Sequence, residues 1–163
     1  MDSPQLIVIV VTTIAGARFN VSASFPIGLY WTRHVVPGKN DLVYFRPPRT
    51  DVFELARERD YIDPSALGAY QPLIKKIVAE EGDTVSVTDE GVIVNQVLIP
   101  DSKPLNKDLA GRLLPHLRIA ERRLVAGEVF LLSDINPRSF DARYFGPMQR
   151  GCIQEAIEPV TTW

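Results

Sequence analysis

The segment from residue 72 to residue 99 places the strongest constraint on the fold, because apolar and polar residues alternate along it. It reads PLIKKIVAEEGDTVSVTDEGVIVNQVLI. Alternation with a period of two is typical of strands that bury one face. Turn-forming pairs interrupt it at Gly82-Asp83 and at Glu90-Gly91. The segment therefore predicts a three-strand antiparallel meander.

Further short strands are predicted on both sides of this segment. LYWTRHVVPGKNDLVYFRPP, residues 29–48, indicates two strands joined by a turn at PGKND. VFLLSD, residues 129–134, indicates a buried strand, and a final strand is expected near residues 152–160. The sum is a mainly β fold of curled antiparallel sheets. We expect an apolar N-terminal segment over residues 1–18 and one domain over residues 19–163.

Three segments interrupt the strand pattern. Residues 51–60, DVFELARERD, predict a short amphipathic helix capped by Asp51, with one face formed by Val52, Leu55, Ala56 and Arg59. Residues 100–123 are more polar and indicate an inserted loop or short helices. Residues 135–148 are rich in turn formers and indicate a loop.

Composition excludes several classes of protein. The 163 residues carry a net charge of only -2, so no basic excess marks the chain for nucleic acid. Cys152 is the single cysteine, which excludes an internal disulfide and a cysteine zinc cluster. His34 and His116 are the only histidines, so a histidine metal site is not expected either. We expect no metal and no cofactor.

The N-terminal run LIVIVVTTIAGA, from Leu6 to Ala17, has no charge, and Arg18 closes it. Three interpretations compete: part of a membrane anchor, the core of a signal peptide, or a buried strand. A membrane span needs roughly 20 apolar residues, which is more than this run has. A signal peptide needs a basic start, whereas only Asp2 precedes the run as a charged residue. The absence of a preceding Lys or Arg leaves the orientation open.

The stretch NVSASFPIGLY places Ser22 and Ser24 just before a Pro26-Ile-Gly28 corner. A surface turn explains this composition, and so does a nucleophile on a rigid corner. A serine hydroxyl attacks only when a neighbouring base accepts its proton. The two histidines have no plausible partner set, so a Ser-His-Asp hydrolase is not expected.

Two further stretches carry candidate chemistry. If PLIKKIV is a strand, Lys75 and Lys76 face opposite sides, and one ammonium points inward. Burial lowers the pKa of such a lysine and lets it act as a general base to serine. The alternative is a solvated strand edge. Ser139, Asp141 and Arg143 alternate in SFDARYFG and indicate either a hydrogen-bond network or a structural ion pair.

In this order, the three stretches resemble the type I signal peptidase family of serine-lysine endopeptidases. The resemblance is closer to the conjugal-transfer branch, the TraF-type peptidases. In that branch the serine lies two residues before the proline, as Ser24 does before Pro26, within an Asn-x-x-x-Ser-x-Pro-x-Gly-x-Tyr pattern. The resemblance covers residues 20–31, 72–85 and 129–148, and leaves the N-terminal run, 49–70 and 101–123 largely uncovered.

The resemblance implies a role for each matched residue. Ser24 would be the nucleophile, Lys75 the general base, and Ser22 would complete the oxyanion hole together with the N–H of Ser24. The matched supporting residues would be Ser139, Asp141, Arg143 and Asp134. Lys76 stands where the family usually has arginine. Ser133 stands where leader peptidases have the glycine of Gly-Asp-Asn, which puts the local backbone freedom in doubt.

The implied function is endoproteolysis of an exported precursor, above all a conjugative pilin precursor, with a linear or cyclic product. The substrate would bind as an extended strand along a sheet edge, in a pocket shaped by Phe25 and the strand around Val43. The resemblance places the chain in the bacterial inner membrane with its catalytic domain on the periplasmic side. Three alternatives stay open: a general leader peptidase, a non-catalytic assembly factor of a secretion or conjugation system, and a self-cleaving repressor domain. A repressor would need a DNA-binding helix-turn-helix, which this sequence does not indicate.

Overall fold

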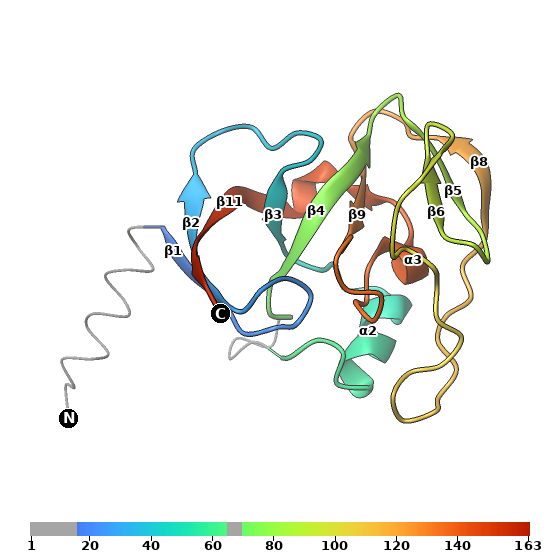
Figure 1. The fold of residues 1–163 in the computed structure, drawn as a ribbon, viewed down its shortest axis with the longest axis horizontal. Coiled ribbons are helices and arrows are strands. Elements are labelled where there is room, and N and C mark those ends of the chain that lie inside the picture. Colours follow the sequence, from blue (N-terminus) through green and yellow to red (C-terminus); the bar gives the residue numbers. More distant parts are fainter. Residues whose placement is uncertain (1–15, 65–69) are drawn as a thin grey trace.

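The computed structural model describes residues 16–64 and 70–163, and it is mainly β (Figure 1). The expected N-terminal segment 1–18 therefore lies almost wholly outside the described residues. Two curled antiparallel sheets, of seven and four strands, account for the architecture, which confirms the predicted fold class. Within the described part of the chain, no helix is both long and apolar enough to cross a membrane.

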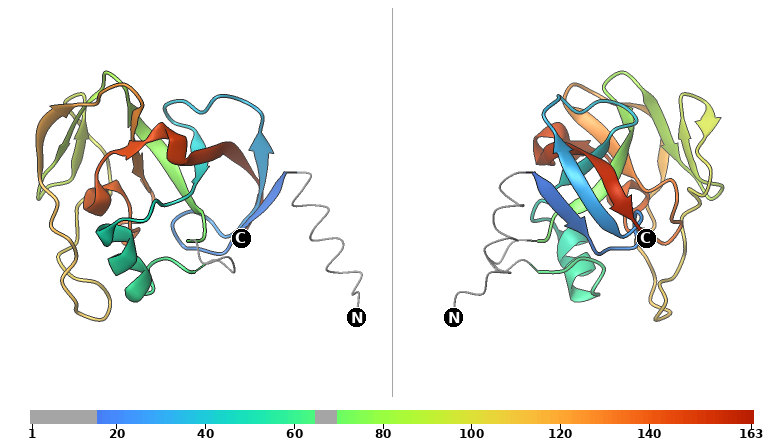
Figure 2. Two further views of the ribbon diagram at one scale, coloured as in Figure 1. Left: turned by 180° about the vertical axis from the view of Figure 1, so that it is seen from behind. Right: turned by 60° about the vertical axis from the view of Figure 1, so that its left-hand side comes forward.

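The seven-stranded sheet has the order β1-β2-β11-β3-β4-β9-β10. Its strands are β1 (Ala17–Asn20), β2 (Gly28–Arg33), β3 (Leu42–Phe45), β4 (Leu73–Glu80), β9 (Glu128–Leu132), β10 (Met148–Gln149) and β11 (Ile153–Thr162). The two strands predicted within 29–48 exist as β2 and β3, but they do not pair with each other. The long β11 lies between them and pairs with both, so that it joins the β1–β2 hairpin to the rest of the sheet (Figures 1 and 2).

The four-stranded sheet has the order β7-β6-β5-β8. Its strands are β5 (Thr84–Val87), β6 (Val92–Val94), β7 (Val97–Leu98) and β8 (Ile119–Arg123). The prediction of a meander beginning at Leu73 was wrong in one respect, because β4 belongs to the larger sheet and only β5, β6 and β7 form the meander. The reason is burial on both faces of β4. Ile77 packs in one hydrophobic core, whereas Val78 and Ala79 pack in a second core under the small sheet.

The predicted helix is present as α2 (Asp51–Glu58), with a different cap and a different buried face. Thr50, not Asp51, is the N-cap residue, and its carbonyl accepts from the backbone N–H groups of Phe53 and Glu54. The buried residues are Phe53 and Ala56, because Phe53 inserts its ring into the aromatic cluster beneath the large sheet. Of the predicted face, only Ala56 is fully buried.

The remaining two segments are mostly loop, as expected, with short elements at their ends. The 100–123 segment runs as an irregular loop that ends in β8. The 135–148 loop contains the single-turn helix α3 (Ala142–Phe145). Both loops lie on the same side of the molecule as α2 (Figure 1).

Candidate active site

Asn20 fixes the corner that carries the two serines. Its buried side chain donates from Nδ2 to the carbonyl oxygens of Ser22 and Phe25 at 3.0 and 2.9 Å. Its Oδ1 accepts from the backbone N–H and the hydroxyl of Ser22, at 3.0 and 2.9 Å. One amide thus closes the loop at the end of β1. The sequence pattern contained Asn20 but assigned it no role.

The other residues of the pattern have equally local reasons. Tyr30 is buried in β2, and its hydroxyl donates to the carbonyl oxygen of Pro26 at 2.7 Å. Gly28 has a φ of +155°, and a Cβ there would lie 2.2 Å from the carbonyl oxygen of Thr161 in β11. Only glycine permits this approach of β11. The corner therefore enters β2 in one fixed direction.

Lys75 lies on β4 with its side chain pointing inward, and only 1% of the residue is exposed. Lys76 points the other way, where its ammonium pairs with the half-exposed Asp134 at 2.7 Å. Desolvation lowers the pKa of Lys75 to about 8, against a smaller rise caused by Asp141 and a further decrease caused by Arg143. The alternation expected for a strand is confirmed, and it separates the two lysines.

Three polar atoms meet at the end of the serine loop. The Nζ of Lys75 lies 2.7 Å from the Oγ of Ser24 and 2.8 Å from the Oγ of Ser139. The two hydroxyl oxygens are themselves 3.1 Å apart. The first and third of the three stretches thus converge on the one lysine that the second stretch buries.

A buried ion pair lies behind this triangle. The guanidinium of Arg143 donates to Asp141 from Nε and Nη2, at 2.8 and 2.7 Å, and neither side chain is exposed. Its remaining hydrogen-bonding capacity is used by the backbone carbonyl oxygens of Asp101, Asn136, Pro137 and Ser139. Asp141 also accepts from its own helix, at the N–H of Arg143. A pair with this many partners holds the loop around Ser139 rigid.

The loop after β9 also clamps the backbone beside Ser24, which sequence reasoning did not predict. The hydroxyl of Ser133 donates to the carbonyl oxygen of Ser24 at 2.5 Å, and Asn136 donates from Nδ2 to the carbonyl oxygen of Ala23 at 2.8 Å. The N–H of Ser133 in turn donates to Asp141 at 3.1 Å. Ser133 thus links the ion pair to the main chain of Ser24.

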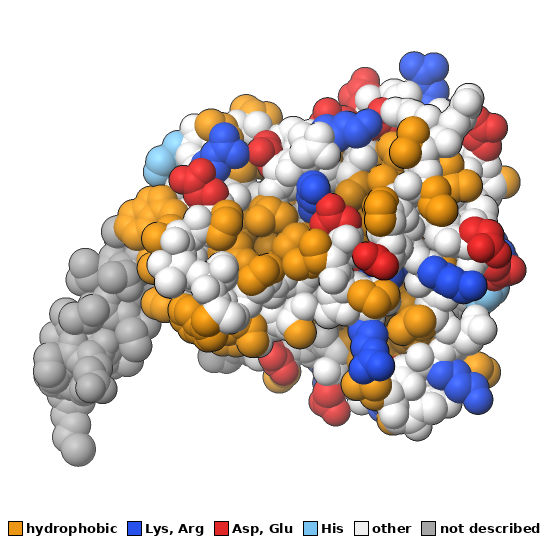
Figure 3. Space-filling view, viewed as in Figure 1, with side chains coloured by type: hydrophobic (Ala, Val, Ile, Leu, Met, Phe, Trp, Pro, Cys, Tyr) orange, Lys and Arg blue, Asp and Glu red, His pale blue; other side chains and the backbone are white. Residues whose placement is uncertain are grey.

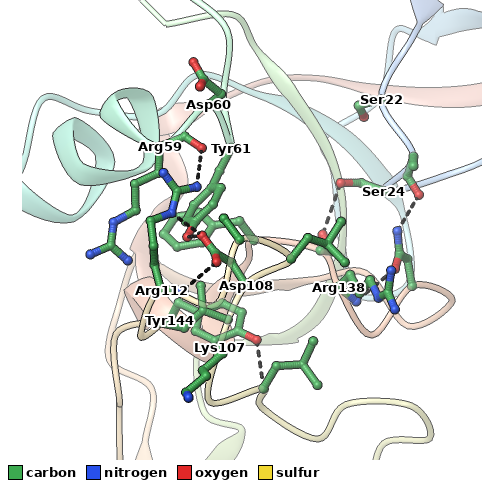
Figure 4. A pocket seen from close by; sticks show the side chains of 18 residues that line it. Ser22, Ser24, Arg59, Asp60, Tyr61, Lys107, Asp108, Arg112, Arg138 and Tyr144 are labelled. Atoms are coloured by element: carbon green, nitrogen blue, oxygen red, sulfur yellow. Dashed lines mark hydrogen bonds and ion pairs between the residues drawn. The ribbon is translucent and has the colours of Figure 1, made fainter.

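A cavity of about 930 Å³ opens beside Ser24 (Figure 4). Ser22, Ser24 and Ser139 line it on one side, together with Asn136 and Arg138. Phe25 is not among the residues that line it. The ring of Phe25 packs instead with Tyr30 and Ile74, and Val43 is fully buried in the main core. The predicted part for Phe25 and Val43 in shaping the pocket therefore has no support in this geometry.

Residues 6–159 match the family described as signal peptidase, peptidase S26. The chain belongs to that family. Among the residues that the structure describes, no cluster of His, Cys, Asp and Glu could hold a metal ion. Membership of this family supports a peptidase-like role for the chain. It also confirms, at the level of the family, the resemblance found in the three sequence stretches.

Relatives of this chain include proteins named for plasmid transfer. The chain is 45% identical over 150 residues to the plasmid transfer protein TraF of Escherichia coli, covering 91% of this chain and 84% of that protein. It is 33% identical to the conjugal transfer protein TraF of Agrobacterium tumefaciens, with the same two coverages. A signal peptidase I of Enterococcus faecalis V583 shares 19% identity at a TM-score of 0.40, over 74% of this chain and 95% of that one.

Proposed function

We propose that the chain is a serine endopeptidase with a Ser24-Lys75 dyad. The observation that carries the proposal is the short contact between a fully buried lysine and a serine hydroxyl that borders a cavity. With a pKa of about 8, about one Lys75 side chain in ten is neutral at pH 7, compared with fewer than one in a thousand for an ordinary lysine. Burial therefore supplies the base that serine needs.

In the acylation step, neutral Lys75 accepts the proton of Ser24 as Oγ attacks the peptide carbonyl carbon. Ser139 holds the amine on its other side at 2.8 Å, which orients the lone pair toward Ser24. The resulting ammonium gives its proton to the leaving amine, and the C–N bond breaks. An acyl-enzyme and a free amino terminus are the products of this half-reaction.

The negative charge on the former carbonyl oxygen is held by the N–H of Ser24 and the hydroxyl of Ser22. The Ser22 hydroxyl now donates to Asn20 at 2.9 Å, so a rotation about its Cα–Cβ bond is needed to reach the oxyanion. One such donor contributes roughly 2.7–4 kcal/mol to catalysis in other enzymes. Water, activated by Lys75, then releases the acyl group. If the substrate's own amine attacks instead, the product is cyclic.

The proposed substrate is an exported precursor polypeptide, bound as an extended strand, and above all a conjugative pilin precursor. The high identity to proteins named for plasmid transfer supports this choice. We place the enzyme at the bacterial inner membrane with its catalytic domain in the periplasm. Hydrophobic side chains gather over the β1, β2 and β11 end of the sheet (Figure 3), and they include Phe19, Val21, Ile27, Trp31, Val160 and Trp163. Exposed tryptophans are typical of a membrane interface.

Two other functions remain as alternatives. A general leader peptidase would use the same dyad on many exported proteins, and substrate profiling separates it from a dedicated pilin enzyme. A non-catalytic assembly factor would not need a reactive serine. Covalent labelling of Ser24 by a serine-reactive or lactam probe excludes that alternative.

The deciding experiment is mass spectrometry of a candidate pilin precursor co-expressed with the parent enzyme, with Ser24→Ala and with Lys75→Ala. We expect processing by the parent alone, together with unchanged thermal unfolding of Ser24→Ala. Processing by Ser24→Ala would contradict the proposal. The mass of the mature pilin also separates a linear from a cyclic product, because cyclisation removes one water.

A further inference from the structure

The cavity wall opposite Ser24 is built from two segments that contain none of the three motif stretches. The turn after α2 supplies Tyr61, whose hydroxyl donates to Asp108 in the 100–123 loop at 2.6 Å. Arg112 of that loop donates from Nε to the same carboxylate at 2.6 Å and from Nη2 to the carbonyl oxygen of Arg59 at 3.1 Å. These contacts join two distant segments into one surface that faces the serines across the cavity (Figure 4).

This cavity carries an excess of positive charge in a protein whose net charge is negative. Its charged lining residues are Arg59, Lys107, Arg112 and Arg138, against Asp60 and Asp108. Tyr61 and Arg112 donate to the carboxylate of Asp108 and lower its pKa, so this carboxylate stays ionised. The guanidinium of Arg112 already balances its negative charge. The exposed Arg138, next to Ser139 on the serine side of the cavity, and the exposed Lys107 of the 100–123 loop remain to meet a ligand. Arg59 adds its positive charge to the lining, but its guanidinium already donates from Nη1 to the carbonyl oxygen of Leu113 at 2.6 Å.

We infer that the cavity binds carboxylate groups of the substrate polypeptide, on a segment that passes from Ser24 to the wall formed by α2 and the 100–123 loop. This inference rests on the proposed function and adds the chemical class of the substrate segment. A guanidinium offers paired donors that match a carboxylate. Apolar side chains also line the cavity, among them Leu105, Leu114 and Phe140. They give an acidic segment a surface for its aliphatic carbons.

The test measures binding to the full-length Ser24→Ala protein in a mild non-ionic detergent, so that cleavage does not intervene. The probes are fluorescent ten-residue peptides with a central Ala-Gly. One peptide carries two Glu residues after the central Ala-Gly, and a second carries two Glu residues before it. Each has a matched control peptide with Gln in place of both Glu residues. Fluorescence anisotropy gives the Kd of each peptide at low salt and at high salt.

One of the two Glu peptides is expected to bind roughly three- to tenfold more tightly than its Gln twin at low salt, because each exposed ion pair contributes modestly. The preference should shrink at high salt. It should also shrink in Arg138→Gln and Lys107→Gln. It should not shrink in Arg46→Gln, which changes an exposed arginine that follows β3 and does not line the cavity.

Equal Kd values for Glu and Gln peptides in both arrangements would overturn the inference. So would a Glu preference that survives in Arg138→Gln and Lys107→Gln. Failure of the proposed function gives a different result: the parent enzyme, with Ser24 intact, would leave the tightly bound Glu peptide uncleaved while the charge preference persists.

Discussion

The hydroxyl of Ser133 donates to the backbone carbonyl oxygen of Ser24 across 109 positions of sequence, at a distance of 2.5 Å. The contact fixes the peptide plane that follows Ser24, and the buried carboxylate of Asp141 fixes Ser133 by accepting from its N–H. Ser133 is therefore a positioning residue: it touches no reacting atom, but it determines where Ser24 stands.

Ser133→Ala should lower kcat about five- to tenfold with little change in KM, because a lost hydrogen bond of about 1 kcal/mol misplaces the nucleophile without affecting substrate binding. Steady-state cleavage of a peptide substrate checks this. Ser102→Ala is the matched control, since Ser102 is equally buried and donates to the carbonyl oxygen of Ile99, remote from the cavity. Similar losses of kcat in both variants would show a general effect on stability instead.

Activity should rise with pH and level off above about pH 8. The reactive form of Lys75 is the neutral amine, and its population increases as pH passes the lowered pKa of about 8. The measurement is kcat/KM between pH 6 and 10 under conditions where chemistry limits the rate. A flat profile over this range would contradict a lysine base.

The same pKa makes a prediction about stability. The pKa of Lys75 is about 8 in the folded protein and 10.5 as its ordinary value, so the unfolded chain binds the proton more tightly. The parent protein should therefore gain stability relative to Lys75→Met as pH rises from about 8 to 10.5, by on the order of 3 kcal/mol. Denaturant unfolding of both proteins at several pH values measures it. A constant difference would mean that Lys75 is not desolvated.

Two arginine substitutions separate the neighbouring lysines. Lys75→Arg keeps a positive charge that cannot be removed near neutral pH, so cleavage should fall by at least 1,000-fold, in the range of other lost catalytic residues. Lys76→Arg keeps the ion pair with Asp134 and should cleave within about twofold of the parent. Peptide cleavage assays decide, and the reverse pattern would make Lys76 the base.

Gly28→Ala should destabilise the fold by at least about 2 kcal/mol, since a Cβ at Gly28 would collide with the backbone of β11 and the residue has a φ of +155°. Gly38→Ala is the matched control, because a Cβ there has no neighbour within 4 Å. Thermal unfolding compares the two variants. An equal Tm for both would show that β11 can move away from Gly28.

The contact between Ser24 and Lys75 could be expected from the family resemblance, because the matched stretches are short local patterns. A Pro-Gly corner, an inward position on a strand and an alternating polar loop each encode their geometry within a few residues. Ser133, by contrast, stood out only as a departure from the family's glycine. Its partner is the carbonyl oxygen of Ser24, and a backbone acceptor leaves no mark in the sequence.

Long-range pairing explains the other differences. Nothing local indicates that β11 separates β2 from β3, or that β4 leaves the meander for the larger sheet. The predicted buried face of α2 was wrong because Phe53 packs in an aromatic cluster whose other members are distant in the sequence. The wall of the cavity depends on Tyr61 meeting Asp108, which only the folded chain brings together.

The position of β11 also sets when Ser24 and Lys75 can come together during synthesis. Ser24 belongs to the hairpin on one side of this strand, and Lys75 belongs to a strand on its other side. A growing polypeptide that has reached the end of β9 already contains every residue of the dyad, yet the strand that holds the two halves of the sheet in register is still to be synthesised. If the proposed function holds, proteolysis waits for translation to finish, and an incomplete chain cannot cleave its neighbours.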